Sequence, residues 1–260
     1  MLVTFRIIDK RGKKMIIDTH CHLNDACFEK CLGDVVSRAQ AAGVRAYIVP
    51  SYDIESLSRT ASLPSTLPGI YMAFGIHPLY LPQKFPIELL ESFCKKERTV
   101  AIGEIGLDFV PNAISSDIQE KRLREQIELA MSLKLPVILH CRKAMERLYD
   151  VLKDYQNKIQ GVLHSFSGGA ECAVKFAKLG FYISFSGSVT RKNAVRYHQT
   201  AEKVPLELML VETDAPCIGT ESILAGSVEP MHTTEVVQAI AKIRGESIER
   251  ISEQTTQNAK

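Results

Sequence analysis

The residues best suited to chemistry in this sequence are histidines and acids that directly follow short apolar segments. His20 and His22 come just after the apolar run that ends at Ile17. If this run is a buried β-strand, side chains at positions i and i+2 leave the same face, so both imidazoles would enter one space. Two converging imidazoles can hold one divalent cation. Alone, this motif is weak support for a metal site, because two ordinary histidines give the same pattern.

The same arrangement recurs along the chain. Four more potential ligands end apolar segments: Glu104, His140, His164 and Asp214. Any one of them could be a hydrogen-bonded polar residue at a strand end. Six such residues on one edge of a sheet would supply nitrogen and oxygen ligands for two divalent cations. A carboxylate from one strand could bridge the ions, and Glu104 and Asp214 are the acidic candidates.

The elements that must position these residues alternate between strand and helix patterns. Strand candidates lie at 15–17, 46–50, 70–74, 99–103, 136–139, 161–163, 181–185 and 208–211. Helical patterns cover 35–42, 58–63, 117–134, 142–155, 173–179 and 235–244, and two more begin at Pro86 and after the cap Ser247. The spacing leaves room for the right-handed crossovers of parallel strands. Eight such alternations in about 250 residues predict an α/β protein with a TIM (β/α)8 barrel.

This barrel is expected to form a single domain over residues 15–260. No linker, repeat or low-complexity tract divides the chain, and no GxGxxG motif follows the first strand, which disfavours a doubly wound sheet. Residues 1–14 are expected to be an N-terminal extension or a leading strand. Because TIM-barrel enzymes place their chemistry at the carboxyl ends of the strands, the six candidate ligands should share one rim.

Composition limits the classes of function. A formal net charge of +2 over 260 residues provides no broad basic surface for nucleic acid or membrane. The seven cysteines include no CxxC pair, which indicates reduced thiols rather than a disulfide scaffold. No apolar run reaches membrane-spanning length and the N-terminus lacks a signal-peptide pattern, so we expect a soluble, cytoplasmic protein.

Five segments together resemble the motif series of the TatD-family metal-dependent hydrolases, the TatD-type deoxyribonucleases of the amidohydrolase superfamily. In chain order they are DTHCHL (18–23), GEIGLD (103–108), HCR (140–142), HSFSG (164–168) and ETDAP (212–216). They occur in the order typical of the family and extend over nearly the whole chain. The resemblance implies a TIM barrel, two divalent cations (Zn²⁺, Mg²⁺ or Mn²⁺) and phosphodiester hydrolysis, here expected to be 3′–5′ exodeoxyribonuclease activity.

The resemblance also implies roles for the ligands. One metal would be held by His20 and His22 and the other by His140 and His164, with Glu104 bridging and Asp214 beside the nucleophilic water. On this reading a metal-activated water attacks phosphorus, and Asp214 accepts its proton.

Three further residues are candidates for substrate binding, each with a structural alternative. Arg142 could clamp a phosphate or form a salt bridge at a helix start. His77 could contact the phosphate or the scissile oxygen, or serve only to support the site. Ser165 precedes a glycine pair at a helix start and could offer its backbone N–H to an anion, or lie in a plain loop.

The sequence departs from the family pattern where the substrate is expected to lie. Leu79 follows GIHP (75–78), where many members carry a further histidine or similar polar residue. Residues 227–230 read SVEP, where many members have an RNEP-like stretch, and Glu229 is a candidate substrate contact. Members also usually continue a few residues past the position of Lys260, consistent with a truncated sequence.

Two alternative functions remain open. An ester or amide hydrolase, such as a D-aminoacyl-tRNA deacylase, could use the same metals. Many dinuclear amidohydrolases bridge their metals with a modified lysine, whereas here the fourth strand supplies Glu104, which favours the nuclease. The second alternative is a metal-binding scaffold without catalysis, which would be free to lose ligands, and none is missing. The low net charge favours short single-stranded DNA ends over duplex as substrate.

Overall fold

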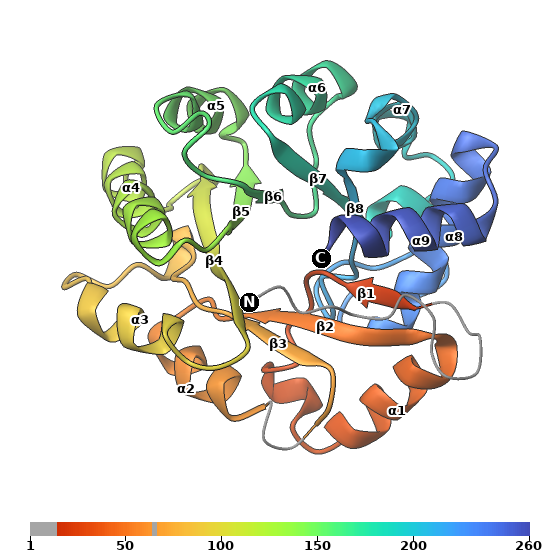
Figure 1. The fold of residues 1–260 in the computed structure, drawn as a ribbon, viewed down its shortest axis with the longest axis horizontal. Helices are drawn as coiled ribbons and strands as arrows, with labels where there is room; N and C mark the ends of the chain where they lie inside the picture. The colour runs from red at the N-terminus through yellow and green to blue at the C-terminus, as the bar shows by residue number, and fades with distance from the viewer. Residues whose placement is uncertain (1–14, 64–66) are drawn as a thin grey trace.

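A computed structural model describes residues 15–63 and 67–260 and has the predicted architecture. Eight parallel strands pair in chain order from β1 to β8 and form a nearly closed barrel surrounded by helices (Figure 1). The strands are β1 Ile16–Asp18, β2 Val44–Pro50, β3 Ile70–Ala73, β4 Thr99–Asp108, β5 Val137–Arg142, β6 Gly161–Leu163, β7 Phe181–Phe185 and β8 Met209–Val211. The ring is completed by the Thr19 backbone N–H, which donates to the Val211 carbonyl at 3.2 Å. The prediction of a TIM barrel is therefore confirmed.

The helices bury one apolar stripe each against the outside of the barrel. They are α1 Leu32–Ala42, α2 Ile54–Ser62, α3 Ile87–Cys94, α4 Ser116–Leu133, α5 Met145–Lys153, α6 Ala170–Lys178, α7 Val195–Lys203, α8 Thr233–Arg244 and α9 Ile248–Asn258. In α4, for example, Leu123, Ile127 and Ala130 are buried at helical spacing. Gly43 ends α1 with φ 101°, and the Ser247 side chain caps α9 by accepting from the Arg250 N–H.

Some boundaries differ from prediction where the sequence pattern and the ladder of hydrogen bonds disagree. β4 continues five residues past the expected end, so Glu104 lies inside the strand rather than at its end. β5 likewise includes His140 and Arg142, and α5 begins only at Met145 instead of residue 142. Glu104 and His140 were expected to end their strands because the apolar pattern stops at those positions. The pairing of β4 with β5 nevertheless continues as far as Asp108 and Arg142.

The last helix covers the end of the barrel opposite the candidate site. The Thr256 hydroxyl donates to the Met15 carbonyl at 2.6 Å, and the Asn258 amide donates to the Leu206 and Met209 carbonyls at 2.7 and 2.8 Å. The chain therefore ends near the middle of the ring (Figure 1). α9 therefore links β1 to β8 at their amino ends.

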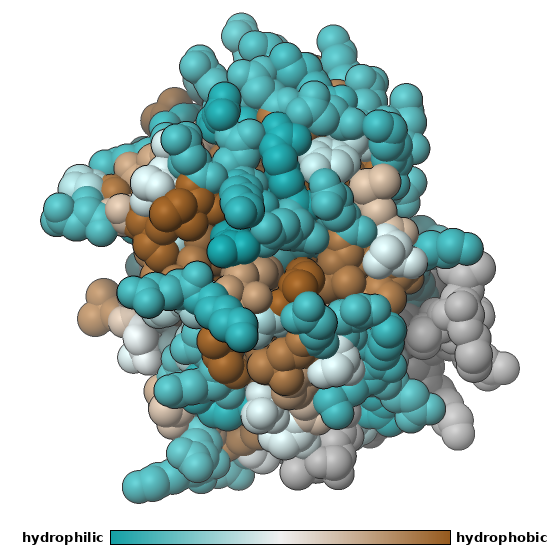
Figure 2. Space-filling view, turned by 90° about the vertical axis from the view of Figure 1, so that its left-hand side faces the viewer, coloured by the Kyte–Doolittle hydropathy of each residue, from teal (hydrophilic) through white to brown (hydrophobic). Residues whose placement is uncertain are grey.

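The surface is mainly hydrophilic, although hydrophobic patches interrupt it on the side that carries α3 and α4 (Figure 2). Most large hydrophobic side chains are buried, but Leu79 and Tyr80 are among the exposed ones. Over residues 15–63 and 67–260, no helix combines the length and apolar character needed to cross a bilayer. The expected extension or leading strand at residues 1–14 lies outside the described residues.

Candidate active site

The loops that follow β1 and β8 are joined, and this junction positions the first group of ligands. The Asp214 N–H donates to the His20 carbonyl and the His22 N–H donates to the Ala215 carbonyl, both at 2.8 Å. Below them, Asp18 is fully buried and accepts from the backbone N–H groups of His20 and Thr213. The strand itself ends at Asp18, so His20 and His22 converge because of these loop hydrogen bonds and not because of strand alternation.

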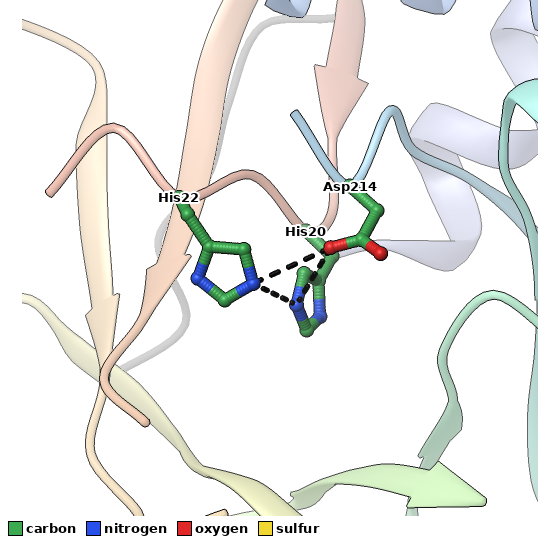
Figure 3. Close-up of side chains that lie close together, drawn as sticks. All are labelled: His20, His22 and Asp214. Atoms are coloured by element: carbon green, nitrogen blue, oxygen red, sulfur yellow. Dashed lines mark hydrogen bonds and ion pairs between the residues drawn. The ribbon is translucent and has the colours of Figure 1, made fainter. Parts of the chain in front are cut away.

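The imidazoles of His20 and His22 and the carboxylate of Asp214 point toward one another (Figure 3). The two Nε2 atoms are 3.2 Å apart, and the Asp214 Oδ1 atom lies 3.6 Å from His20 and 3.3 Å from His22. Glu104 Oε2 lies 3.4 and 3.7 Å from the same two nitrogens. Four donor atoms from three different strands or strand-end loops therefore surround one point.

The other oxygen of Glu104 faces a second group of imidazoles. Glu104 Oε1 lies 3.0 Å from His140 Nδ1 and 2.9 Å from His164 Nε2, and these two nitrogens are 3.2 Å apart. The Nε2 atom of His77 lies 3.5 Å from the same oxygen. The Glu104 carboxylate is thus divided between two histidine pairs, which is the placement that a bridging ligand requires.

The spacing of these atoms fits divalent metal ions. Ligand atoms about 2.0–2.2 Å from one tetrahedral ion stand roughly 3.3–3.6 Å from each other. The separations in the first group, 3.2 to 3.7 Å, match this range. Those in the second group, 2.9 to 3.2 Å, are slightly shorter. Nitrogen and carboxylate ligands suit Zn²⁺, Mn²⁺ and related ions. The residues present can therefore bind metal.

Two acids lie behind the second pair of histidines. Asp108 Oδ2 lies 3.0 Å from His140 Nε2, and Glu212 Oε1 lies 3.4 Å from His164 Nδ1. In each of these imidazoles, one nitrogen therefore faces Glu104 and the other faces an outer carboxylate. Such outer carboxylates fix the tautomer and orientation of metal-binding histidines. The sequence analysis assigned no such role to Asp108 or Glu212, although both lie within the quoted motifs.

The carboxylates at the centre favour their ionised forms. Burial opposes the ionisation of Glu104, but the charge of His164 and the hydrogen bonds from His140 and His164 hold its pKa well below the usual range. Burial likewise opposes ionisation of Asp214, and the hydrogen bond with His22 nevertheless lowers its pKa. For His164, burial favours the neutral imidazole, yet Glu104 raises its pKa well above the ordinary value. The central carboxylates are therefore negatively charged, and a bound metal ion would take the place of the protons on the neighbouring histidines.

An open pocket of about 420 Å³ leads from these ligands to the surface. His77, Arg142 and Ser165, the predicted substrate-binding residues, all line it. Among the described residues Arg142 has no salt bridge of the kind considered as its alternative role, although its charge helps to lower the pKa of Asp108. The Ser165 backbone N–H donates to Glu212 Oε1 at 2.6 Å, so it is not free to bind an anion, and the Ser165 hydroxyl is hydrogen-bonded to the Ser186 hydroxyl at 2.7 Å.

The two departures from the family pattern have different outcomes. Leu79 lines the pocket, as expected. Val228 is buried in the core and Glu229 forms a two-bond ion pair with Arg38 of α1, so the expectation that residues 227–230 lie over the substrate is wrong. The reason is that Val228 is apolar and packs inward, which turns Glu229 toward α1.

The pocket also contains aromatic residues that the sequence analysis did not single out. Tyr52, Tyr80 and Tyr197 line it. They come from the loops after β2 and β3 and from α7, and the GIHP motif just before Tyr80 pointed only to His77 and Leu79.

Comparison with known proteins agrees with this geometry. The family model described as "TatD related DNase" matches residues 17–260. The metal-dependent hydrolase YabD of Bacillus subtilis is 34% identical over 249 residues, which are 95% of this chain and 98% of YabD. The crystal structure of YjjV, a TatD homologue from Escherichia coli, superposes with a TM-score of 0.86 at 31% identity, covering 94% of this chain and 95% of YjjV. The chain therefore belongs to the TatD-related DNase family and is a metal-dependent hydrolase.

Proposed function

We propose that this protein is a 3′–5′ exodeoxyribonuclease that uses two divalent cations to cleave phosphodiesters at single-stranded DNA ends. The observation that carries the proposal is the division of the Glu104 carboxylate between two pairs of imidazoles. His20 and His22 would hold one cation and His140 and His164 the other, with Asp214 beside the first. When bound, two such ions lower the pKa of a water molecule and neutralise charge on the phosphate oxygens.

The chain's own residues account for the rest of the reaction. Asp214 is ionised, lies at the mouth side of the first group and accepts the proton of the attacking water. His77 Nδ1 accepts from the Leu79 N–H at 3.2 Å, so its Nε2 carries the proton and can donate to a phosphate oxygen. Arg142 at the pocket wall supplies a positive fork for a second oxygen.

The pocket and the charge favour a short single-stranded end. A space of about 420 Å³ suits roughly one nucleotide and not a duplex. A net charge of +2 gives the protein little overall attraction for the phosphates of a duplex. The seven cysteines are all unpaired, which supports a reducing compartment such as the cytoplasm.

The test uses metal-stripped protein and a single-stranded oligonucleotide labelled at its 5′ end, titrated with Mg²⁺, Mn²⁺ and Zn²⁺. A 3′–5′ exonuclease will shorten the labelled strand stepwise. Glu104→Ala and Asp214→Asn should each lower the rate by at least about 100-fold. The matched control is Glu128→Ala, because Glu128 is an exposed acid on α4 and should leave the rate unchanged.

Each alternative gives a different result. Immediate release of a short labelled product would indicate the opposite direction. Absence of DNA cleavage with any metal, together with hydrolysis of an aminoacyl-tRNA ester, would replace the proposal with the deacylase. Metal binding without hydrolysis of either substrate would indicate the scaffold.

A further inference from the structure

The walls of the active-site pocket differ in chemistry. One wall, formed by the loops after β2 and β3, carries Tyr52, Leu79 and Tyr80. Part of the opposite wall, formed after β5 and β6, carries Arg142, Ser165 and Ser167, with Tyr197 beyond them. A nucleotide has the same two parts, an aromatic base and an anionic phosphate. This asymmetry suggests how the substrate is oriented above the metal ligands.

Tyr52 is held rigidly beside the first group of ligands. Its hydroxyl accepts a hydrogen bond from Arg59 Nη2 at 3.0 Å, and its backbone N–H donates to Ser56 Oγ at 2.9 Å. Its ring meets the His22 imidazole edge-on, with centroids 5.6 Å apart. Tyr52 therefore connects the ligand cluster to the pocket wall and has little freedom to move.

Tyr80 lies outside Tyr52 and faces the solvent. Its side chain is 53% exposed, which is unusual for an aromatic ring in a pocket. The ring centroids of Tyr80 and Tyr52 are 5.5 Å apart and the planes are tilted by 51°. This tilted contact leaves no space for a base between the rings, so a base can stack only on the free face of Tyr80.

The position of Tyr80 is tied to His77. The Tyr80 N–H donates to the His77 carbonyl, and the His77 N–H donates to the Tyr52 carbonyl, both at 2.9 Å. The ring centroids of His77 and Tyr80 are 5.7 Å apart, and His77 Nε2 is 3.5 Å from Glu104. One imidazole thus separates the exposed ring from the metal ligands.

We propose that Tyr80, supported by Tyr52, is the stacking platform for the base of the nucleotide that is removed. This inference rests on the proposed function and extends it, because it defines the direction of the substrate across the pocket. The base lies on Tyr80 beside Leu79, and the scissile phosphate lies between His77 and Arg142. Every base offers a π face, so the platform binds all four, and purines more tightly than pyrimidines because they cover more of the ring.

The first test compares Tyr80→Ala and Tyr80→Phe on two oligonucleotides, one with a normal 3′ end and one with an abasic 3′ residue. Tyr80→Ala should raise KM about tenfold on the normal end, the effect of losing one base–aromatic stack, with little change in kcat. The same variant should leave KM unchanged on the abasic end, and Tyr80→Phe should behave as wild type on both. An equal loss on both ends would overturn the proposal, because the effect would then not involve the base.

A second measurement does not depend on cleavage. Metal-free protein is titrated into an oligonucleotide with 2-aminopurine at its 3′ end, whose fluorescence is quenched by stacking. Wild type, Tyr80→Phe and the control Ile248→Ala, an exposed side chain on α9 far from the pocket, should quench it, and Tyr80→Ala should not. Quenching retained in Tyr80→Ala, or absent in wild type, would refute the platform. Quenching without any cleavage by the metal-loaded enzyme would instead leave the platform standing and refute the nuclease.

Discussion

At the scale of single residues, the site depends on acids that do not face its centre. His140 presents Nδ1 to Glu104 only because Asp108 contacts its Nε2 at 3.0 Å. Glu212 is fully buried and contacts His164, the Ser165 N–H and the Ser184 hydroxyl. The hydrogen bond with Asp108 holds His140 in the tautomer that leaves its inner nitrogen free for a metal ion, and the longer contact with Glu212 orients His164.

Asp108→Asn should therefore weaken metal binding 10- to 100-fold, because the amide no longer holds the His140 tautomer with a carboxylate. The measurement is competition for Zn²⁺ or Mn²⁺ against a chelator of known affinity. Asp150→Asn is the control, since Asp150 is an exposed acid on α5 paired with Lys153. Equal metal affinity in the two variants would contradict the role assigned to Asp108.

The imidazole of His77 should stay neutral to unusually low pH. Burial, reinforced by His140 and His164 and opposed by Glu104, lowers the pKa of His77 from 6.5 to about 4. In metal-free protein its NMR titration should therefore be centred near pH 4. Unfolded chain binds this proton near pH 6.5 and folded protein does not, so His77 lowers the stability as the pH falls from about 6.5 to 4.

His77→Asn should remove this one-proton contribution to the loss of stability in acid. The free energy of unfolding, measured by denaturation at several pH values, should then fall less steeply between about pH 6.5 and 4. A His77 titration centred near 6.5 would show that the ring is solvated in the folded protein.

At the scale of elements, β4 is the strand on which the site depends. It is the longest of the eight, and Glu104 lies in its middle while Asp108 ends it. Gly106 makes this possible, because its φ is 150° and a Cβ there would collide with the backbone carbonyl of His140 on β5. The close approach of the two strands aligns Gly106 with His140 and brings Asp108 within reach of that imidazole.

Gly106→Ala should destabilise the protein by about 3 kcal/mol or more, because it combines backbone strain with a collision between backbones. Unfolding in urea measures this change. The control is Gly169→Ala, since a Cβ at Gly169 meets nothing within 4 Å and its φ is −83°. That substitution should change the stability by less than about 1 kcal/mol. Similar losses in both variants would mean that the β4–β5 approach does not require glycine.

At the scale of the whole molecule, metal binding and stability should be coupled. Only the folded barrel brings the ligands together, because they come from segments nearly 200 residues apart in the sequence, from His20 to Asp214. An ion that binds only the folded state at 100 times its Kd adds about 2.7 kcal/mol of stability.

Removal of metal with a chelator should lower Tm by about 5–10 °C for a protein of this size, and added Zn²⁺ or Mn²⁺ should restore it. Calorimetry measures the shift. Glu104→Gln should have little or no metal-dependent shift, because the proposed bridge between two ions would lose its charge. A full shift in that variant would show that Glu104 does not contribute to metal binding.

Much of the architecture was determined by the sequence itself. Apolar runs with alternating helices predicted each strand of the barrel, because strand pairing and helix burial follow local periodicity. The same periodicity placed His20, His140, His164 and Asp214 near strand ends and so brought the candidate ligands to one rim. Local pattern alone could not show that β4 continues past Glu104, because that extension depends on hydrogen bonds to β5.

Other features were decided only by the tertiary structure. Convergence of His20 and His22 requires hydrogen bonds from the loop after β8, nearly 200 residues away. The contact between Asp108 and His140 depends on strand register, and the opposite orientations of Leu79 and Glu229 depend on how each loop packs. The tilted contact between Tyr52 and Tyr80 joins two loops that share no sequence motif. Periodicity determines which elements form, whereas contacts between distant loops determine which side chains meet.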